Sequence, residues 1–402
     1  MSTSPFSVYV HVPFCARKCP YCDFNTYAVA KVPESEYVSA VCCEIDRYSE
    51  MPGFQGRSVQ TVFFGGGTPS ILSSESLARI LEAIDSAFGI CPGAELSLEA
   101  NPRDASPAFL EGIREAGFNR ISFGVQSFDD ERLVALGRDH SSAEAREAIE
   151  RAVAAGFFNV SLDLIFGTPG QTLSQLEHDL SVAVSLPVAH ISTYALSIEP
   201  GTPFFQRQER GLLRLPPDDT VVALLARIPE VLAESGFARY EISNYAKVGF
   251  ESRHNMAYWR GGDYLGVGAG AHSYLARYDA RGFIASAERW ATLASPSAFV
   301  VAAESGLRVA GAPDAESTIS WCEVLDTSGL MFEFFYLGMR MVCGVTDQEF
   351  HHRFGSAMPK AYMQRLKELV QEGYVDRSGK RFALTTRGVA VADSVFERLV
   401  LG

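Results

Sequence analysis

The chain has 402 residues, of which 47% are apolar and 21% are charged. This composition is typical of a globular protein with a large core, and it excludes disordered and fibrous proteins. There are 48 acidic and 35 basic residues, and the net charge of −13 argues against nucleic acid as a partner. The N-terminal segment has no secretory-signal pattern and no apolar run approaches ~18 residues, so we expect a cytoplasmic protein.

From residue 6 to about residue 200, short apolar runs alternate with helical patterns, which is typical of repeated β-α units. Apolar residues at three- and four-residue spacing predict a helix over 74–88. Capping patterns predict two further helices that begin near Ser106 and Thr172. We predict six β-α units, with strands at 6–12, 59–64, 95–100, 120–126, 159–165 and 189–195.

Polar residues alternate with valine, isoleucine and leucine along these strands, as at Ser97 and Glu99 or at Ser161 and Asp163. In a β/α barrel the outer face of each strand packs against helices and is apolar, so the polar residues should point inward. A closed eight-stranded barrel fills its interior with branched apolar side chains. The polar interior therefore predicts an α/β fold with an open, partial (β/α)6 TIM-like barrel that lines a ligand cavity.

The second half of the chain shows a different pattern. A helical pattern covers 219–235, whereas 276–318 is rich in alanine and serine without a clear period and is expected to wrap the surface. Helical stretches at 328–340, 346–354 and 358–373 precede a short β-wing and a terminal helix. We predict a partial barrel over 1–210, a connecting region over 211–325, and a smaller, mainly helical, winged-helix-like domain over 326–402.

Three of the eight cysteines, Cys15, Cys19 and Cys22, lie within eight residues directly after the first predicted strand. Barrel enzymes place their chemistry at the carboxyl ends of their strands. Three thiolates can hold a four-iron cluster and leave one iron open to another ligand. The alternative is a structural zinc site that includes His11, but such sites usually carry their cysteines in two separated pairs. The spacing favours an iron–sulfur cluster.

A Gly-Gly-Gly-Thr-Pro run at 65–69 follows the second predicted strand. Glycines let a backbone approach a ligand closely and leave N–H and C=O groups free to bind it. Such a run on its own is more often an ordinary turn. Its place one β-α unit after the cysteine triplet favours a binding segment.

The CxxxCxxC spacing, with Tyr21 before the third cysteine, resembles the signature of the radical S-adenosylmethionine (SAM) superfamily. The resemblance implies a [4Fe-4S] cluster held by the three cysteines, with its open iron bound to SAM. Further motifs resemble the oxygen-independent coproporphyrinogen oxidase-like family, namely YVHVPFC, GGGTP, EANP (99–102), GVQSF (124–128), LGRDH (136–140) and DLIFGTPGQT (163–172). The residues that this resemblance places around SAM are Tyr9, Tyr21, Phe24, Gly66, Gly67, Thr68, Glu99, Gln126, Arg138, Asp163 and Ala195.

A last motif, HNMAYW at 254–259, resembles a signature of the heme-chaperone branch of this family. A neutral imidazole is a common axial ligand of heme iron, and aromatic side chains offer flat apolar surface to a porphyrin. The resemblance implies heme contacts by His254, Asn255, Tyr258 and Trp259. The alternative is a buried histidine that is hydrogen-bonded beside packed aromatic residues.

The resemblance favours the chaperone branch over the oxidase branch. The oxidases carry a further cysteine two residues after the triplet, where this chain has Phe24, and a longer N-terminal extension. The resemblance thus implies a protein that binds heme and passes it to an acceptor hemoprotein, without coproporphyrinogen oxidase activity. An oxidase, and a radical SAM methyltransferase that acts on heme, are the alternatives. The resemblance does not decide whether the protein forms a homodimer or makes a weak peripheral membrane contact.

The remaining cysteines and histidines carry no clear signal. We expect Cys91, Cys322 and Cys343 to be small buried side chains. The pair His351-His352 is expected on a solvated face.

Overall fold

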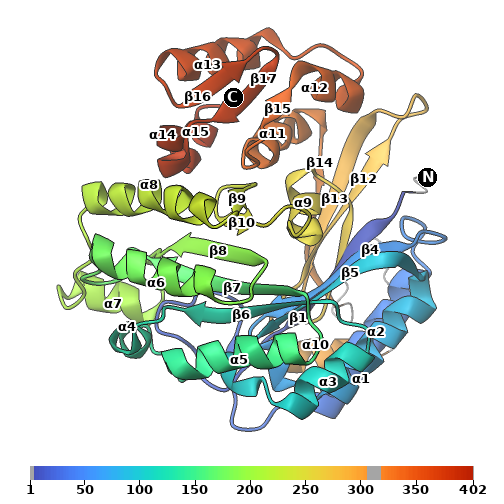
Figure 1. Cartoon of the computed structure of the whole chain (residues 1–402). Coiled ribbons are helices and arrows are strands. Elements are labelled where there is room, and N and C mark those ends of the chain that lie inside the picture. Colours follow the sequence, from blue (N-terminus) through green and yellow to red (C-terminus); the bar gives the residue numbers. More distant parts are fainter. Residues whose placement is uncertain (1–3, 306–317, 402) are drawn as a thin grey trace.

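The computed structural model describes residues 4–305 and 318–401. One mixed sheet of twelve strands runs through most of this part of the chain, in the order β14-β13-β12-β11-β1-β4-β5-β6-β7-β8-β10-β9. Helices lie along the outside of the curved sheet, and a separate C-terminal domain sits beside one end of it (Figure 1).

Six consecutive parallel strands form the middle of the sheet. They are β1 (Phe6–Val12), β4 (Val59–Gly66), β5 (Ile90–Ala100), β6 (Arg120–Gln126), β7 (Asn159–Phe166) and β8 (His190–Ala195). Each strand pairs in parallel with the next one along the chain. Within the described residues the two end strands, β14 and β9, do not pair with each other. The predicted six-unit partial barrel is therefore confirmed.

Six helices lie between these strands, and the five after the first begin at a side-chain cap. They are α1 (Glu34–Ser49), α2 (Ser74–Phe88), α3 (Pro107–Glu115), α4 (Asp130–Ala135), α5 (Ser142–Ala154) and α6 (Leu173–Ser185), with short 3₁₀ turns η1 (Pro69–Ile71) and η2 (Pro102–Asp104). The Ser106 side chain accepts the N–H of Phe109, and Thr172 forms the predicted capping box with Gln175. Their apolar faces join the outer strand faces in one large core.

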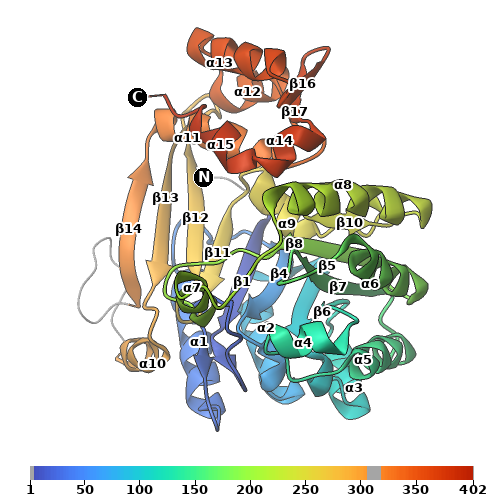
Figure 2. The same ribbon diagram turned by 90° about the vertical axis from the view of Figure 1, so that its left-hand side faces the viewer.

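The expectation that 276–318 wraps the surface is wrong for the described part of that segment. The sheet continues through β11 (Tyr264–Val267), β12 (His272–Tyr278), β13 (Ile284–Thr292) and β14 (Ile319–Leu325), with α10 (Pro296–Glu304) between the last two. Figure 2 shows β12, β13 and β14 as a long antiparallel extension. Buried positions do not alternate along β13, and alanine, which is frequent in this segment, has low β-propensity, so no strand was predicted there. Residues 306–317 lie outside the described part.

The chain between β8 and β11 supplies the remaining elements of the barrel and of the predicted connecting region. They are α7 (Pro203–Glu209), α8 (Asp218–Glu234), β9 (Ala238–Arg239), β10 (Asn244–Ala246) and α9 (Arg253–Trp259). Strand β10 pairs antiparallel with β8 and with β9. Residues 211–325 thus supply strands at both ends of the sheet.

The C-terminal domain has its own core. Its elements are α11 (Thr327–Gly338), β15 (Val345–Thr346), α12 (Asp347–Phe354), α13 (Lys360–Gln371), β16 (Val375–Ser378), β17 (Arg381–Leu384), α14 (Thr386–Ala390) and α15 (Ala392–Glu397). The strands form a small sheet in the order β15-β17-β16. Phe335, Phe350 and Tyr362 stack in the core between the helices. This mainly helical domain with a β-wing is as predicted.

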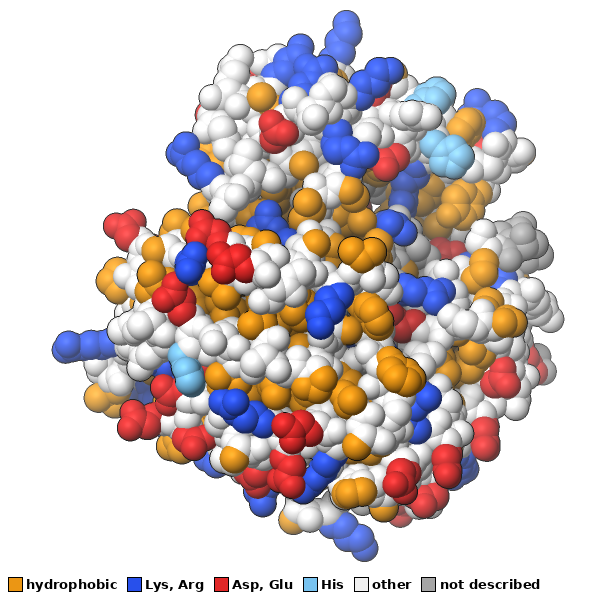
Figure 3. Space-filling model, viewed as in Figure 1, with side chains coloured by type: hydrophobic (Ala, Val, Ile, Leu, Met, Phe, Trp, Pro, Cys, Tyr) orange, Lys and Arg blue, Asp and Glu red, His pale blue; other side chains and the backbone are white. Residues whose placement is uncertain are grey.

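The surface mixes acidic, basic and apolar side chains on the face seen in Figure 3. In the described part of the chain, no helix is both long enough and apolar enough to cross a bilayer. His351 and His352 are exposed, as predicted. Cys322 and Cys343 are also exposed and Cys91 is half-buried, which corrects the expectation of burial: Cys322 lies on β14, at the end of the sheet formed by the described residues.

Candidate functional site

A cavity of about 570 Å³ opens at the carboxyl ends of the parallel strands. Its wall includes the segment after β1, the turn after β4, and the ends of β5 to β8. The predicted site residues in this wall are Cys15, Cys19, Tyr21, Cys22, Phe24, Gly66, Gly67, Thr68, Glu99, Gln126, Arg138, Asp163 and Ala195. Tyr9 does not line it, and its hydroxyl is hydrogen-bonded to Nδ1 of His11 at 3.0 Å.

The three cysteines lie on one loop beside this cavity. A two-residue parallel pair, β2 (Phe14–Cys15) with β3 (Tyr27–Ala28), closes the loop at its base. Thr68 Oγ1 donates to Cys15 Sγ at 3.4 Å, and Arg138 Nη1 donates to Cys19 Sγ at 3.4 Å. Burial raises the pKa of the Cys15 and Cys22 thiols. Coordination to iron would have to displace these protons, as it does at other thiolate sites.

The donor set fits an iron–sulfur cluster better than a single zinc ion. All three cysteines are free. In the described residues no three side chains of His, Cys, Asp or Glu are grouped closely enough for one ion. A four-iron cube binds each cysteine at a different iron, so its ligands need not converge on one point. His11, the fourth ligand of the zinc alternative, is buried, with Nδ1 bonded to Tyr9 and Nε2 to the Asn25 carbonyl.

The glycine run after β4 passes close beneath the cysteine loop. Gly66 has φ of 108°, and a Cβ there would lie 2.4 Å from the His11 ring. A Cβ on Gly67 would lie 2.6 Å from the carbonyl oxygen of Phe14. These positions therefore require glycine. The N–H groups of Gly67 and Thr68 donate to the carbonyls of Val12 and Phe14, so the expectation that they are free for a ligand is wrong.

Two carboxylates, Glu99 on β5 and Asp163 on β7, form the acidic part of the cavity wall. Glu99 Oε2 accepts the N–H of Gly66 at 3.3 Å, and Asp163 Oδ1 accepts the hydroxyl of Ser122 at 3.3 Å. Burial and the neighbouring Asp163 raise the pKa of Glu99 to about 8, and burial raises the pKa of Asp163. Like charges with raised pKa values gain most from a bound cation, so this wall suits a positively charged ligand.

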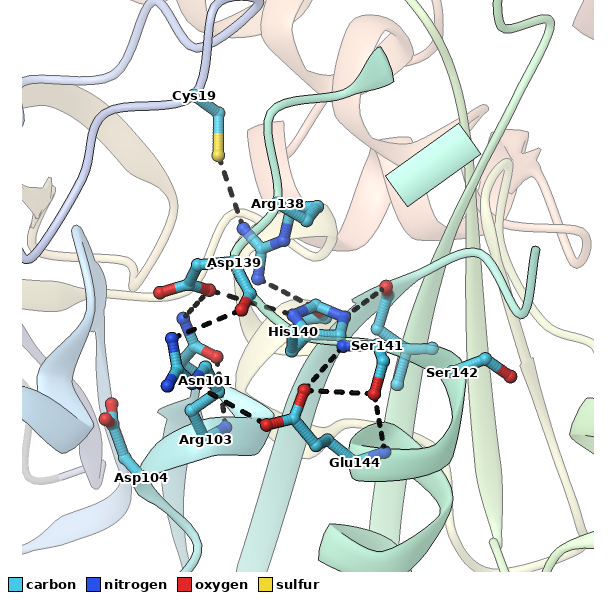
Figure 4. A network of polar contacts seen from close by, with 12 residues as sticks. Cys19, Asn101, Arg103, Asp104, Arg138, Asp139, His140, Ser141, Ser142 and Glu144 are labelled. Carbon is cyan, nitrogen blue, oxygen red and sulfur yellow. Dashed lines mark hydrogen bonds and ion pairs between the residues drawn. The ribbon is translucent and has the colours of Figure 1, made fainter. Parts of the chain in front are cut away.

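Arg138 connects the cysteine loop to the opposite wall. Its Nη2 donates to the carbonyl of Gly124 at 2.8 Å, while Nη1 reaches Cys19 (Figure 4). Next to it, Asp139 accepts Asn101 Nδ2 at 3.1 Å. Gln126, at the end of β6, has φ of 71° and is the one described non-glycine residue with positive φ. Strained backbone of this kind is concentrated at ligand sites.

The HNMAYW motif lies on α9, away from this cavity. His254 is 1% exposed. Its Nδ1 is hydrogen-bonded to Thr61 Oγ1 at 2.8 Å, its Nε2 to the Tyr258 hydroxyl at 2.9 Å, and its ring stacks on Phe63. Burial lowers its pKa to about 3. Both ring nitrogens are thus engaged, and the arrangement matches the alternative reading of a buried, hydrogen-bonded histidine beside aromatic residues.

The rest of the motif joins the barrel to the C-terminal domain. Tyr258 meets the ring of Tyr264 edge-on, with centroids 4.5 Å apart. The guanidinium of Arg340, from the C-terminal domain, lies 5.5 Å from the Trp259 ring centroid. The backbone N–H of Asn255 is capped by the Ser252 hydroxyl. The motif therefore packs between two domains in this conformation.

Two further polar residues of the barrel interior do not line the cavity. His190 Nδ1 is hydrogen-bonded to Ser161 and its Nε2 to Tyr240, each at 2.8 Å. Arg120 is buried at the start of β6. Arg120 lies on the same face of β6 as Ser122 and Gln126, so the two-residue alternation could have predicted it as a residue of the barrel interior.

Two family models match the chain. The radical SAM superfamily model covers residues 9–183, and the HemN C-terminal domain model covers residues 326–391. The solved structure of coproporphyrinogen III oxidase (HemN) from Escherichia coli superposes with a TM-score of 0.80 at 20% identity, over 98% of this chain and 90% of that one. At this identity the likeness shows a shared fold.

Curated relatives match along the whole chain. The heme chaperone HemW of Bacillus subtilis is 35% identical, over 97% of this chain and 98% of its own length. The protein of the same name from Mycobacterium tuberculosis is 37% identical over 100% and 96%, and that from Escherichia coli is 34% identical over 98% and 97%. Both parts of the fold and the segment between them are included in these matches.

Proposed function

Because the chain belongs to the heme chaperone HemW family of radical SAM proteins, we propose that it binds heme and transfers it to an acceptor hemoprotein. The full-length similarity to HemW proteins carries this proposal. The cavity that holds the cysteine loop, the glycine turn and the paired carboxylates supports a resident [4Fe-4S] cluster with SAM.

We assign the cluster to Cys15, Cys19 and Cys22. The two carboxylates, Glu99 and Asp163, would bind the positive charge of SAM, and Arg138 is placed to balance the charge of the cysteine loop. Phe24, 64% exposed beside the cavity, stands where the oxidases carry a further cysteine. When bound, cluster and SAM supply one-electron chemistry. The chain's own residues hold them in a cavity shielded by the sheet.

The heme ligand is a separate question. Ligation by His254 would require the ring to leave two hydrogen bonds and a buried site, which is costly. We therefore do not place the axial ligand there. A heme titration of the holoprotein, followed by the loss of heme absorbance on addition of an apo-hemoprotein, tests binding and transfer directly.

Coproporphyrinogen oxidation is the alternative activity, because the fold is shared with that oxidase. The holoprotein is incubated anaerobically with coproporphyrinogen III, SAM and reductant, and the products are analysed by mass. We expect no loss of two carboxyl groups. Formation of protoporphyrinogen with 5′-deoxyadenosine would replace the chaperone proposal by the oxidase.

We further propose that the protein acts in the cytoplasm. A homodimer and a weak peripheral membrane contact stay predictions. Light scattering after gel filtration measures the first, and sedimentation with anionic lipid vesicles measures the second.

A further inference from the structure

Arg120 has a buried guanidinium that takes no part in the proposed cluster and SAM site. Its side chain is 3% exposed, and no hydrogen bond or ion pair from the guanidinium is found among the residues that the structure describes. Its Nε is fully buried without a partner. An unpaired buried charge costs several kcal/mol unless opposite charges are near. An arginine at this position therefore needs carboxylates within its reach.

The strand geometry places two carboxylates on the neighbouring strands, further along towards the cavity: Glu99 on β5 and Asp163 on β7. Side chains alternate along β6, so Arg120 shares the inward face with Ser122 and with Gln126, which lines the cavity. Ser122 lies roughly 7 Å further along the strand. It pairs in register with Glu99 on β5, and its hydroxyl donates to Asp163 on β7. The two wall carboxylates thus flank the column that begins at Arg120.

The side chains in register with Arg120 are uncharged. Its partners in register are Ser97 and Asn159, whose Oγ and Oδ1 atoms are also buried without a partner. Glu95 accepts the N–H groups of Arg253 and His254. The positive charge of Arg120 lowers the pKa of Glu99 and of Asp163, against burial, which raises both. The ionisable groups that face this region are Glu95, Glu99, Asp163, His190, Tyr240 and His254.

We propose that Arg120 is a positioning residue for SAM: it is the buried counter-charge that favours the ionised form of Glu99 and Asp163 when the positively charged ligand binds. It does not line the cavity and acts through these two side chains. This inference rests on the proposed SAM site. If it holds, polar residues of the barrel interior that do not line the cavity contribute to ligand binding through the side chains that do.

The test measures SAM binding by the reconstituted holoprotein between pH 5.5 and 9, by equilibrium dialysis under argon. Arg120→Met removes the charge at similar length, and Arg120→Lys retains it. We expect Arg120→Met to bind SAM about tenfold more weakly than the wild type at pH 7. The acidic limb of the binding curve, where affinity falls as the pH is lowered, should lie at least about one pH unit higher than in the wild type. The Lys variant should lie within about threefold of the wild type. Asn159→Ala, in the same row but uncharged, should leave the limb in place.

The outcomes separate the inference from the SAM site itself. If Arg120→Met binds SAM and its affinity falls over the same pH range as that of the wild type, the positioning role is overturned, even if the melting temperature of the variant falls. The same holds if Lys fails to restore the limb. If Met does not fold, Arg120→Gln replaces it under the same criteria. A wild-type holoprotein that binds no SAM at any pH would instead overturn the proposed SAM site.

Discussion

Glu44 lies in the middle of α1, with 1% of its surface exposed. Its Oε2 accepts the N–H of Gly268 at 2.8 Å, and the Thr318 side chain lies near the same carboxyl. Burial raises the pKa of this carboxyl to about 8. The folded state therefore holds the proton more tightly than the unfolded state does. Its contribution to stability is full below the usual pKa of about 4.5 and is lost as pH rises towards 8.

Replacing Glu44 by Gln should therefore stabilise the protein in alkali. An amide keeps the bond to Gly268 but cannot ionise. We expect the free energy of unfolding in urea to rise by about 1–3 kcal/mol at pH 8.5 and to change little at pH 4.5. Glu36→Gln, on the exposed face of the same helix, is the control and should have no such pH dependence. Equal effects of Glu44→Gln at both pH values would contradict the buried-acid explanation.

His254 has the opposite pH dependence. Because burial lowers its pKa to about 3, the folded state favours the neutral ring, and stability present above pH 6.5 is lost as pH falls towards 3. His254→Gln should cost about 1–2 kcal/mol at pH 7 and progressively less at pH 5, where the wild type is itself weakened. The unfolding free energy measures this, and a heme titration should give an unchanged Soret band.

The exposed His351→Gln on α12 is the matched control and should alter neither measurement. A Soret band that shifts in His254→Gln alone would return the axial heme ligand to His254. The packing interpretation would then describe only a heme-free conformation.

At the scale of elements, Arg340 joins three helices. Its guanidinium carbon lies 5.5, 4.5 and 5.2 Å from the ring centroids of Trp259 on α9, Tyr336 on α11 and Phe396 on α15. Each such contact is worth about 0.5–2 kcal/mol, and more when water is excluded. Arg340→Ala should lower the unfolding free energy by about 1–3 kcal/mol and speed amide hydrogen exchange in α9 and α15.

The control for Arg340 is Arg387, whose guanidinium lies 4.6 Å from the Tyr374 ring within the C-terminal domain. Arg387→Ala should leave exchange in α9 unchanged. If Arg340→Ala speeds exchange only within the C-terminal domain, the contact does not couple that domain to the barrel.

The strands that sequence analysis found are apolar runs in which valine, isoleucine, leucine or phenylalanine recur. The strands that contain Ser97 and Glu99, or Ser161 and Asp163, alternate without a break, and the structure confirms them. Strand β13 was missed because its sequence, IASAERWAT, is rich in alanine and its buried positions do not alternate. Alternation with a period of two residues shows which side chains share a face of one strand. It does not show what packs against that face.

The individual motifs of the site could be predicted from the sequence, but their arrangement in space could not. The cysteine loop and the wall carboxylates follow strands whose carboxyl ends meet at one edge, so parallel pairing brings them together. His254 also follows a strand, and nothing in its local sequence shows that it enters the barrel from below to reach Thr61. That contact depends on the path of the chain through β9 and β10, which is set by tertiary packing.

At the scale of the whole molecule, the two motifs lie at opposite ends of the parallel strands. The cysteine loop is at the carboxyl ends, while His254 bonds to Thr61, near the start of β4. Between them lies the column of Arg120, Ser122 and Gln126 on β6. The C-terminal domain contacts the His254 end through α9 and α11 (Figure 1). A ligand in the cavity is therefore separated from the C-terminal domain by the polar interior.

This separation predicts that loss of the cluster leaves the fold intact. Cys15→Ala should abolish the visible iron–sulfur absorbance of the reconstituted protein, because its thiolate is one of three ligands. The core packs between strands and helices and does not depend on the loop, unlike a zinc finger, which unfolds without its metal. We therefore expect an unchanged far-ultraviolet circular dichroism spectrum. Cys43→Ala, exposed on α1, should keep both the absorbance and the spectrum. Full iron content in Cys15→Ala would contradict the assigned ligands, and a lost spectrum would show that cluster binding and folding of the sheet are coupled.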